Sequence, residues 1–321
     1  MSKNKIKFDR CVVIVNPASS NYDRGQRLIR QLAEIFPGNR FETIEMRYND
    51  YERPSWLITR LNAAIEKNTL LAIAGGDGTV NLIVDTLLRS SAISKAARES
   101  VILPLWAGNA NDLAHMANGN PPASIDSIIK SGIVSRIYPL AVTTLHASKY
   151  KTKLAVNYVS LGASAYASAR ISKASHRGKR IYRLPGARNL TDMASVTRAF
   201  IGAPTFESNI NGTQRPIYDL AMINGSRIAK VNRVPINLTD KKFYEILVVR
   251  KHPVLISYLV QILRGISVER HTHSERTLTV NETTWAQIDG EALQIPGNTE
   301  ISVRPYDHSF LLLSTKLKAS T

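Results

Sequence analysis

The chain has 321 residues and a formal net charge of +17, from 42 Lys and Arg against 25 Asp and Glu. This length predicts two domains, and 44% hydrophobic residues is typical of a globular chain rather than a disordered one. The single cysteine, Cys11, excludes an internal disulfide and any zinc cluster of several cysteines. No apolar run reaches the roughly 18 residues of a membrane span, and the N-terminus lacks the apolar stretch of a secretion signal. We therefore expect a cytoplasmic protein whose charge favours an anionic partner, either nucleic acid or a membrane surface.

The chain up to Pro121 alternates short apolar runs with helical patterns. Strand–helix alternation of this kind predicts a mostly parallel sheet with helices on both faces. The expected strands are 12–15, 41–46, 70–74 and 101–105, and the expected helices are 24–36, 54–67, a segment ending at 88, and one starting at 111.

Beyond Pro121-Pro122 the pattern becomes rich in strands. We predict domains at 1–132 and 133–321, the second built mainly of antiparallel strands, and we consider that the last strand, 310–314, returns to the first domain. The expected elements are a short helix at 125–130, strands at 136–144, 154–159, 217–223, 243–249, 277–280 and 301–304, and helices at 189–200 and 253–263.

The most informative segment is Gly75-Gly76-Asp77-Gly78-Thr79, which joins a buried strand directly to a helix. Glycines let the backbone turn sharply and approach a ligand, and the N-terminus of the helix attracts phosphate. Asp77 would suit a Mg²⁺ ion that bridges phosphates, or a substrate hydroxyl that must lose its proton. The alternative is a tight structural turn in which Asp77 or Thr79 caps the helix.

Two further polar loops follow predicted parallel strands. Asn16-Pro17-Ala18-Ser19 ends the first strand, and the segment from Pro104 to Ala114, with Gly108, Asn111 and Asp112, follows the fourth. Ligands bind at the carboxyl edge of open α/β sheets, so three such loops predict a binding site there. Alternatively, Asn16-Pro17 forms only a turn and Asn111 or Asp112 only caps a helix.

These three segments, together with Asp289-Gly290-Glu291, resemble the motifs of the diacylglycerol kinase catalytic-domain family in their order and spacing. That family also holds sphingosine and ceramide kinases and bacterial lipid kinases. The resemblance covers nearly the whole chain and implies an N-terminal three-layer α/β nucleotide-binding domain and a C-terminal, mostly antiparallel β-sandwich domain.

The resemblance also implies a reaction and its residues. The protein would use ATP and Mg²⁺ to phosphorylate a lipid hydroxyl, with diacylglycerol as the first expectation and phosphatidic acid as its product. Asp77 would act at the metal and the phosphoryl group, while Asp289 or Glu291 would be the general base or the residue that orients it. The cofactor-binding residues would be Asn16, Gly75, Gly76, Asp77, Gly78, Thr79, Asn81, Gly108, Asn111 and Asp112.

Some positions depart from the family pattern. Leu82 stands where the family usually has Glu, and Trp106-Ala107 stands where it has Gly-Thr. Trp106 either stacks on the nucleotide base or belongs to the core. Of the acidic loop that holds a structural Mg²⁺ in some bacterial members, only Asp240 remains as a metal ligand.

Two alternatives to a lipid kinase stay open. NAD kinases also carry G-G-D-G-T in a similar two-domain plan, so the substrate could be soluble. A non-catalytic member that binds membranes or nucleic acid is the second alternative, because Leu82 and Ala107 replace expected site residues.

The stretch from Arg170 to Arg198 contains eight Lys or Arg residues and one acid, Asp192. We expect this basic stretch to place the protein peripherally on an anionic membrane, with nucleic acid as the less favoured partner and a solvated surface as the alternative. His271 and His273 form a His-x-His pair for which the sequence indicates no third metal ligand. The oligomeric state stays open, a homo-oligomer included.

Overall fold

The computed structural model describes residues 7–46, 54–108, 111–119, 124–177, 198–228, 232–233, 238–249 and 268–316. The chain forms two compact units, each described here by itself. The first unit contains residues 1–139, 224–241 and 306–321, and the second contains 140–223 and 242–305. The first unit thus continues past residue 132, because the strand that follows is part of its sheet.

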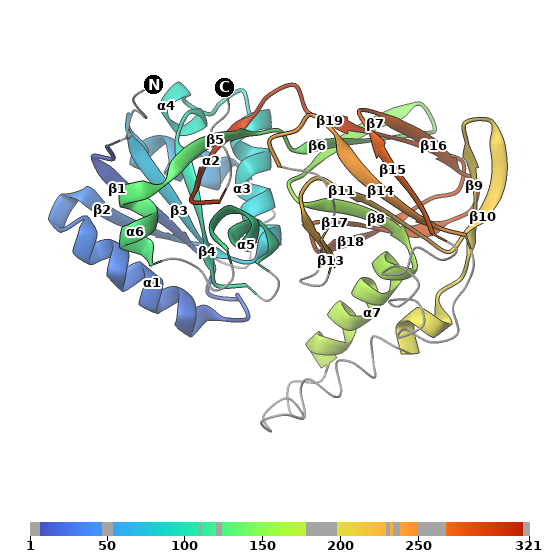
Figure 1. Ribbon diagram of the computed structural model, residues 1–321, viewed down its shortest axis with the longest axis horizontal. Helices are drawn as coiled ribbons and strands as arrows, with labels where there is room; N and C mark the ends of the chain where they lie inside the picture. The colour runs from blue at the N-terminus through green and yellow to red at the C-terminus, as the bar shows by residue number, and fades with distance from the viewer. Residues whose placement is uncertain are drawn as a thin grey trace. The chain divides into compact units, whose positions relative to one another are not determined.

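A six-stranded sheet of order β2-β1-β3-β4-β20-β5 forms the centre of the first unit (Figure 1). The first four strands are parallel, β20 lies parallel to β4, and β5 closes the sheet antiparallel to β20. The strands are β1 (Arg10–Val15), β2 (Phe41–Glu45), β3 (Thr69–Gly75), β4 (Val101–Trp106), β5 (Ile133–Ile137) and β20 (Phe310–Ser314).

Helices cover both faces of this sheet, as continuous apolar strands require. Helices α1 (Tyr22–Ile35) and α6 (Ile125–Ser131) share one core with inward-facing strand residues such as Val13 and Ala72. The other layer holds α2 (Pro54–Ala64), α3 (Asp77–Arg89) and α4 (Lys95–Arg98). The remaining elements are α5 (Asp112–Asn118), the short helix η1 (Gly38–Arg40) and the ribbon of β12 (Arg227–Ile228) and β13 (Asn232–Arg233). The predicted three-layer α/β domain is confirmed.

Two antiparallel six-stranded sheets form the second unit, in the orders β10-β9-β16-β19-β6-β7 and β15-β14-β11-β8-β17-β18. Their inner faces share one apolar core, so they pack as a sandwich, as predicted. Helix α7 (Ala163–Arg177) contacts β8 and β17. The strands are β6 (Leu140–His146), β7 (Lys149–Ala155), β8 (Tyr158–Gly162), β9 (Phe206–Ile210), β10 (Thr213–Ile217), β11 (Asp219–Ile223), β14 (Phe243–Val248), β15 (Val268–His273), β16 (Arg276–Val280), β17 (Thr284–Ile288), β18 (Glu291–Ile295) and β19 (Thr299–Pro305).

Two predicted strands were wrong in their extent. The predicted strand 136–144 is interrupted at Tyr138-Pro139, where the chain leaves the first unit for the second, and proline cannot continue the ladder because it has no N–H. The predicted strand 154–159 is a hairpin instead, with its turn at Val156-Asn157. The predicted helix 253–263, and all but residues 198–200 of the one at 189–200, lie outside the described residues.

Within the described residues, no helix combines the length and the apolar character that crossing a membrane requires.

Candidate active site

The loops after β1, β3 and β4 meet at the carboxyl edge of the parallel sheet. From β1 the chain continues to β2 on one side, and from β3 it continues to β4 on the other, so the strand order reverses between β1 and β3. Open α/β sheets bind their ligands beside such a reversal. The two motifs that follow these strands, at Asn16 and at Gly75, therefore occupy the position where the topology itself predicts a site.

Asn16 joins the first of these loops to the first turn of α3. Its backbone N–H donates to Ala74 O at 2.9 Å, and its side-chain Nδ2 donates to Thr79 Oγ1 at 2.8 Å. Its Oδ1 accepts from Ala18 N at 3.0 Å. Asn16 and Thr79 are both buried, so Asn16 does more than form a turn: it fixes the position of Thr79.

The glycine turn starts α3 without a side-chain cap. The N-cap residue is Gly76, which has no side chain to cap the helix, so the predicted alternative of Asp77 or Thr79 as the N-cap is wrong. Gly75 is required by close packing, because a Cβ there would lie 2.5 Å from Thr79 Cβ. Gly78 is exposed in the same turn. An uncapped first turn next to exposed glycine backbone is a suitable anion site.

The loop after β4 packs directly against this turn. A Cβ on Gly108 would lie 2.3 Å from Gly76 Cα, so only glycine allows the two backbones to approach so closely. Asn111 holds the loop by accepting from Gly108 N at 2.7 Å and donating to Gly108 O at 2.8 Å. Asn21 Nδ2 also donates to Gly108 O, at 2.6 Å. Sequence analysis did not single out Asn21, because a lone Asn before a helix looks like an ordinary cap.

The Asp77 carboxylate lies at the start of α5, close enough to Asp112 to feel its charge. The Asp77 carboxylate accepts from Asp112 N at 3.2 Å and from Leu113 N at 3.3 Å, at the start of α5. Burial, and then the negative charge of Asp112, raise the pKa of Asp77 from 3.8 to about 6, although hydrogen bonds from these backbone amides oppose the rise. A divalent cation beside the two carboxylates would favour the ionised form of Asp77 and remove the repulsion.

The remaining predicted residues of the first unit have different surroundings. Asn81 lies on α3 and is partly buried. Trp106 is 1% exposed and belongs to the core that α1 and α6 share, which supports its interpretation as a core residue. Asp240 lies in a turn before β14, and the described residues contain no group of three or more His, Cys, Asp or Glu side chains that could hold a metal.

Asp289 and Glu291 belong to the second unit and have contrasting environments. Asp289 and Gly290 form the two-residue turn between β17 and β18, with φ of 45° and 93° as a type I′ turn requires. The buried Asp289 carboxylate accepts from the backbone N–H groups of Val156, Asn157 and Tyr158, the last two at 2.9 Å. The Glu291 side chain is 65% exposed and pairs with Lys153 Nζ at 2.8 Å.

Three solved structures have folds similar to that of this chain. A diacylglycerol kinase from Bacillus anthracis str. Sterne has a TM-score of 0.58 at 14% identity, over 96% of this chain and 98% of its own. Another structure from that organism has a TM-score of 0.62 at 15% identity, over 98% of this chain and 99% of its own. Yeast NADH kinase, solved in complex with NADH, has a TM-score of 0.51 at 11% identity, over 98% of this chain and 84% of its own. No curated protein matches the sequence.

At these identities the solved structures establish the fold alone. The family is identified by sequence, because the family model for the diacylglycerol kinase catalytic domain matches residues 10–140. This range contains the loops at Asn16, Gly75 and Gly108 and the carboxylates of Asp77 and Asp112. Over residues 10–140, the chain therefore matches the diacylglycerol kinase catalytic domain family.

Proposed function

We propose that the protein is an ATP- and Mg²⁺-dependent lipid kinase that transfers the γ-phosphoryl group to a lipid hydroxyl, with diacylglycerol as the first candidate. The observation that carries the proposal is the pairing of Asp77 with Asp112 beside an uncapped glycine turn, within a diacylglycerol kinase catalytic domain. Phosphoryl transfer depends on positioning and on neutralising charge, and this arrangement offers both.

The site fits ATP and Mg²⁺. The backbone of Gly76 and Gly78 would hold the phosphates, because α3 starts there with no side-chain cap, whereas Thr79 N already donates to Gly76 O at 2.9 Å. Asp77 and Asp112 offer the oxygen donors that Mg²⁺ prefers, and Mg²⁺ sites commonly use one or two carboxylates together with phosphate oxygens. When bound, Mg²⁺ would neutralise charge on the phosphoryl oxygens.

Of the two candidate bases, we assign the proton-accepting role to Glu291. The carboxylate of Asp289 accepts hydrogen bonds from three backbone N–H groups. This arrangement suits Asp289 to holding the turn between β7 and β8 in place. Glu291 lies two residues further along the chain, and its exposed carboxylate forms an ion pair with Lys153. A carboxylate that keeps free lone pairs can accept the hydroxyl proton.

We also propose that the Arg170–Arg198 stretch binds an anionic membrane. Of this stretch, Arg170 is exposed on α7, and its Nε donates to Tyr166 Oη at 3.0 Å. Residues 178–197 lie outside the described residues. Co-sedimentation of the protein with vesicles should therefore increase with their content of anionic lipid. Binding that does not change with this content would contradict the proposal.

A kinase of a soluble dinucleotide is the second candidate, because the fold also matches that of yeast NADH kinase. Incubation with labelled ATP and Mg²⁺, in parallel with a lipid panel and with NAD or NADH, distinguishes the two. We expect label in the organic phase. Label on the dinucleotide alone would reverse the order of the candidates.

The Asp77→Asn variant tests the role of the site. We expect it to lose nearly all transfer while it remains folded, whereas Asp85→Asn, on the same helix and paired with Arg89 at its surface, should keep full activity. Retained turnover in Asp77→Asn would contradict the proposal. If the unmodified protein labels no acceptor, the non-catalytic alternative is favoured instead.

A further inference from the structure

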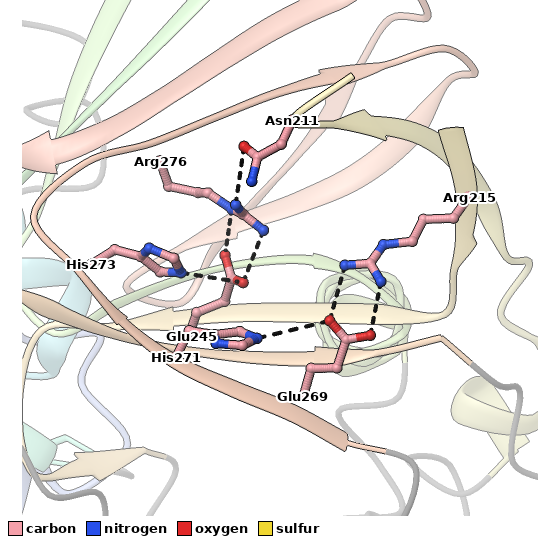
Figure 2. A network of polar contacts seen from close by, with 7 residues as sticks. All are labelled: Asn211, Arg215, Glu245, Glu269, His271, His273 and Arg276. Atoms are coloured by element: carbon pink, nitrogen blue, oxygen red, sulfur yellow. Dashed lines mark hydrogen bonds and ion pairs between the residues drawn. The ribbon is translucent and has the colours of Figure 1, made fainter. Parts of the chain in front are cut away.

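A polar cleft lies within the second unit, between the edge strands β10 and β15 of its two sheets. Its volume is about 330 Å³. Figure 2 shows that charged side chains from β10, β14, β15 and β16 converge there, together with Asn211 from the β9–β10 turn. The catalytic domain of residues 10–140 contributes nothing to this cleft, so the inference does not depend on the proposed function.

Two arginine–carboxylate pairs cross the cleft (Figure 2). Arg215 binds Glu269 through both terminal nitrogens, at 2.8 and 3.0 Å. Arg276 binds the fully buried Glu245, with Nη2 3.1 Å from Oε1 and Nε 2.8 Å from Oε2. Each carboxylate thus has its own guanidinium, and the fixed charges of the cleft cancel.

Hydrogen-bond donors remain in excess. Among the described residues, three nitrogens of the cleft (Arg215 Nε, Arg276 Nε and His273 Nε2) and one acceptor, Glu245 Oε2, are buried without a hydrogen bond. The Arg276 Nε contact with Glu245 has the distance of an ion pair but not the alignment of a hydrogen bond. Buried donors almost always find an acceptor, so these nitrogens suit the cleft to an oxygen-rich ligand.

The protonation state of His273 sets the net charge of the cleft. His273 Nε2 lies 3.5 Å from Glu245 Oε1, and His271 Nε2 lies 3.9 Å from Glu269 Oε2. Burial lowers the pKa of His273; Glu245 opposes this effect, and the positive charges of Arg276 and His271 add to it. The His273 ring is therefore neutral at pH 7 and gains its charge on acidification. At that point the cleft becomes positive.

A metal ion fits the cleft less well than an anion. The His-x-His pair lies on β15, but no described group of three or more His, Cys, Asp or Glu residues is arranged to hold a metal. The guanidinium groups of Arg215 and Arg276 line the same space and would repel a cation.

We propose that this cleft binds a phosphate monoester, and that protonation of His273 accompanies binding. The anion would supply acceptors for these nitrogens, and its negative charge would stabilise the protonated ring of His273. The phosphate could belong to a lipid headgroup or to a water-soluble molecule, since both present the same oxygens.

Inorganic sulfate is the first probe, because it keeps its double charge over the whole pH range in which histidine titrates. We expect its affinity to rise as the pH falls from about 7.5 to 5.5, by at most about tenfold per pH unit for each coupled proton. NMR titration should show that saturating sulfate raises the pKa of His273. A sulfate affinity that is constant or that rises with pH would overturn the proposal. A pKa of His273 that sulfate leaves unchanged would also overturn it.

Variants separate the cleft from general attraction to a positive protein. Arg215→Gln and the double variant His271→Gln/His273→Gln should each weaken sulfate binding at pH 5.5 by tenfold or more. Arg270→Gln removes a charge from an exposed position on the same strand, outside the cleft lining, and should leave binding unchanged. Circular dichroism checks that each variant is folded. Equal losses in the cleft variants and the control would refute the site.

The source of the phosphate is tested with glycerol phosphate in solution and with vesicles that contain phosphatidic acid or only phosphatidylcholine. Glycerol phosphate binding that Arg215→Gln abolishes supports a soluble ligand. Retention on phosphatidic acid vesicles that the same variant reduces supports a lipid headgroup. Insensitivity of both to Arg215→Gln would overturn the proposal.

Discussion

Replacing Asp77 by Asn should abolish transfer and yet make the folded protein more stable at neutral pH. Asp77 sits close to Asp112 in partly buried surroundings that raise its pKa from 3.8 to about 6. At pH 7.5 the carboxylate is ionised in both the folded and the unfolded chain, but the folded environment disfavours the charge. An uncharged isostere removes that penalty.

The size of the effect follows from the pKa. A rise of about two units corresponds to about 3 kcal/mol of unfavourable interaction at pH 7.5. In Asp77→Asn, the new amide side chain keeps one oxygen to accept from the α5 amides and loses the second acceptor, at a cost of about 1 kcal/mol. We therefore expect the free energy of unfolding of this variant to exceed that of the wild type by about 2 kcal/mol at pH 7.5.

The pH dependence has a definite sign. Because the folded chain binds the Asp77 proton more tightly than the unfolded chain does, this group makes the wild-type protein less stable as the pH rises from about 4 to about 6. The advantage of Asp77→Asn should grow across that window, stay constant above it and disappear near pH 3.5, where Asp77 is protonated in both states.

Urea denaturation followed by circular dichroism at pH 4, 5, 6 and 7.5 measures this difference, with Asp85→Asn as the control. Phosphoryl transfer is assayed on the same preparations. A variant that is less stable than the wild type at pH 7.5, or a stability difference of the same size at every pH, would refute the idea that burial and Asp112 disfavour the charge of Asp77.

Two further predictions concern the glycine loops and the β17–β18 turn. Gly108→Ala should lower the free energy of unfolding by about 1–3 kcal/mol in urea titrations, because its Cβ would overlap Gly76 Cα, whereas Gly202→Ala, with open space around it, should change it little. Asp289→Asn should destabilise the protein by about 2 kcal/mol or more, since buried amides lose a charged acceptor, while Glu291→Gln should leave stability within about 0.5 kcal/mol and lower kcat. Equal stability losses in the last two variants would contradict the division of roles between them.

The local pattern of the sequence predicted most of the first unit. The strands β1, β3 and β4 are continuous apolar runs bounded by polar or glycine-rich turns, so both their positions and their burial could be read from the chain. The same reasoning placed the loops at Asn16 and Gly75 at one edge of the sheet. The hydrogen bond from Asn16 to Thr79 brings these two loops together.

Contacts between residues distant in sequence explain what the pattern missed. The predicted strand 154–159 turns back at Val156-Asn157, where the backbone amides are bound by Asp289, more than a hundred residues further along the chain. Sequence periodicity cannot predict a contact with a residue so far along the chain. The cleft between β10 and β15 was missed for the same reason, because Arg215, which pairs with Glu269, and Glu245, which lies beside His273, come from strands distant in the sequence.

The Asp77–Asp112 pair indicates what the site is built to hold. A fold selected for stability alone would not keep a second carboxylate, fully buried, beside Asp77, since the pair raises the energy of the ionised state. The amides of α5 oppose this effect but leave the pKa of Asp77 near 6, so the protein supplies only part of the compensation. Under the proposed function, a cation bound between the glycine turn and α5 would supply the rest.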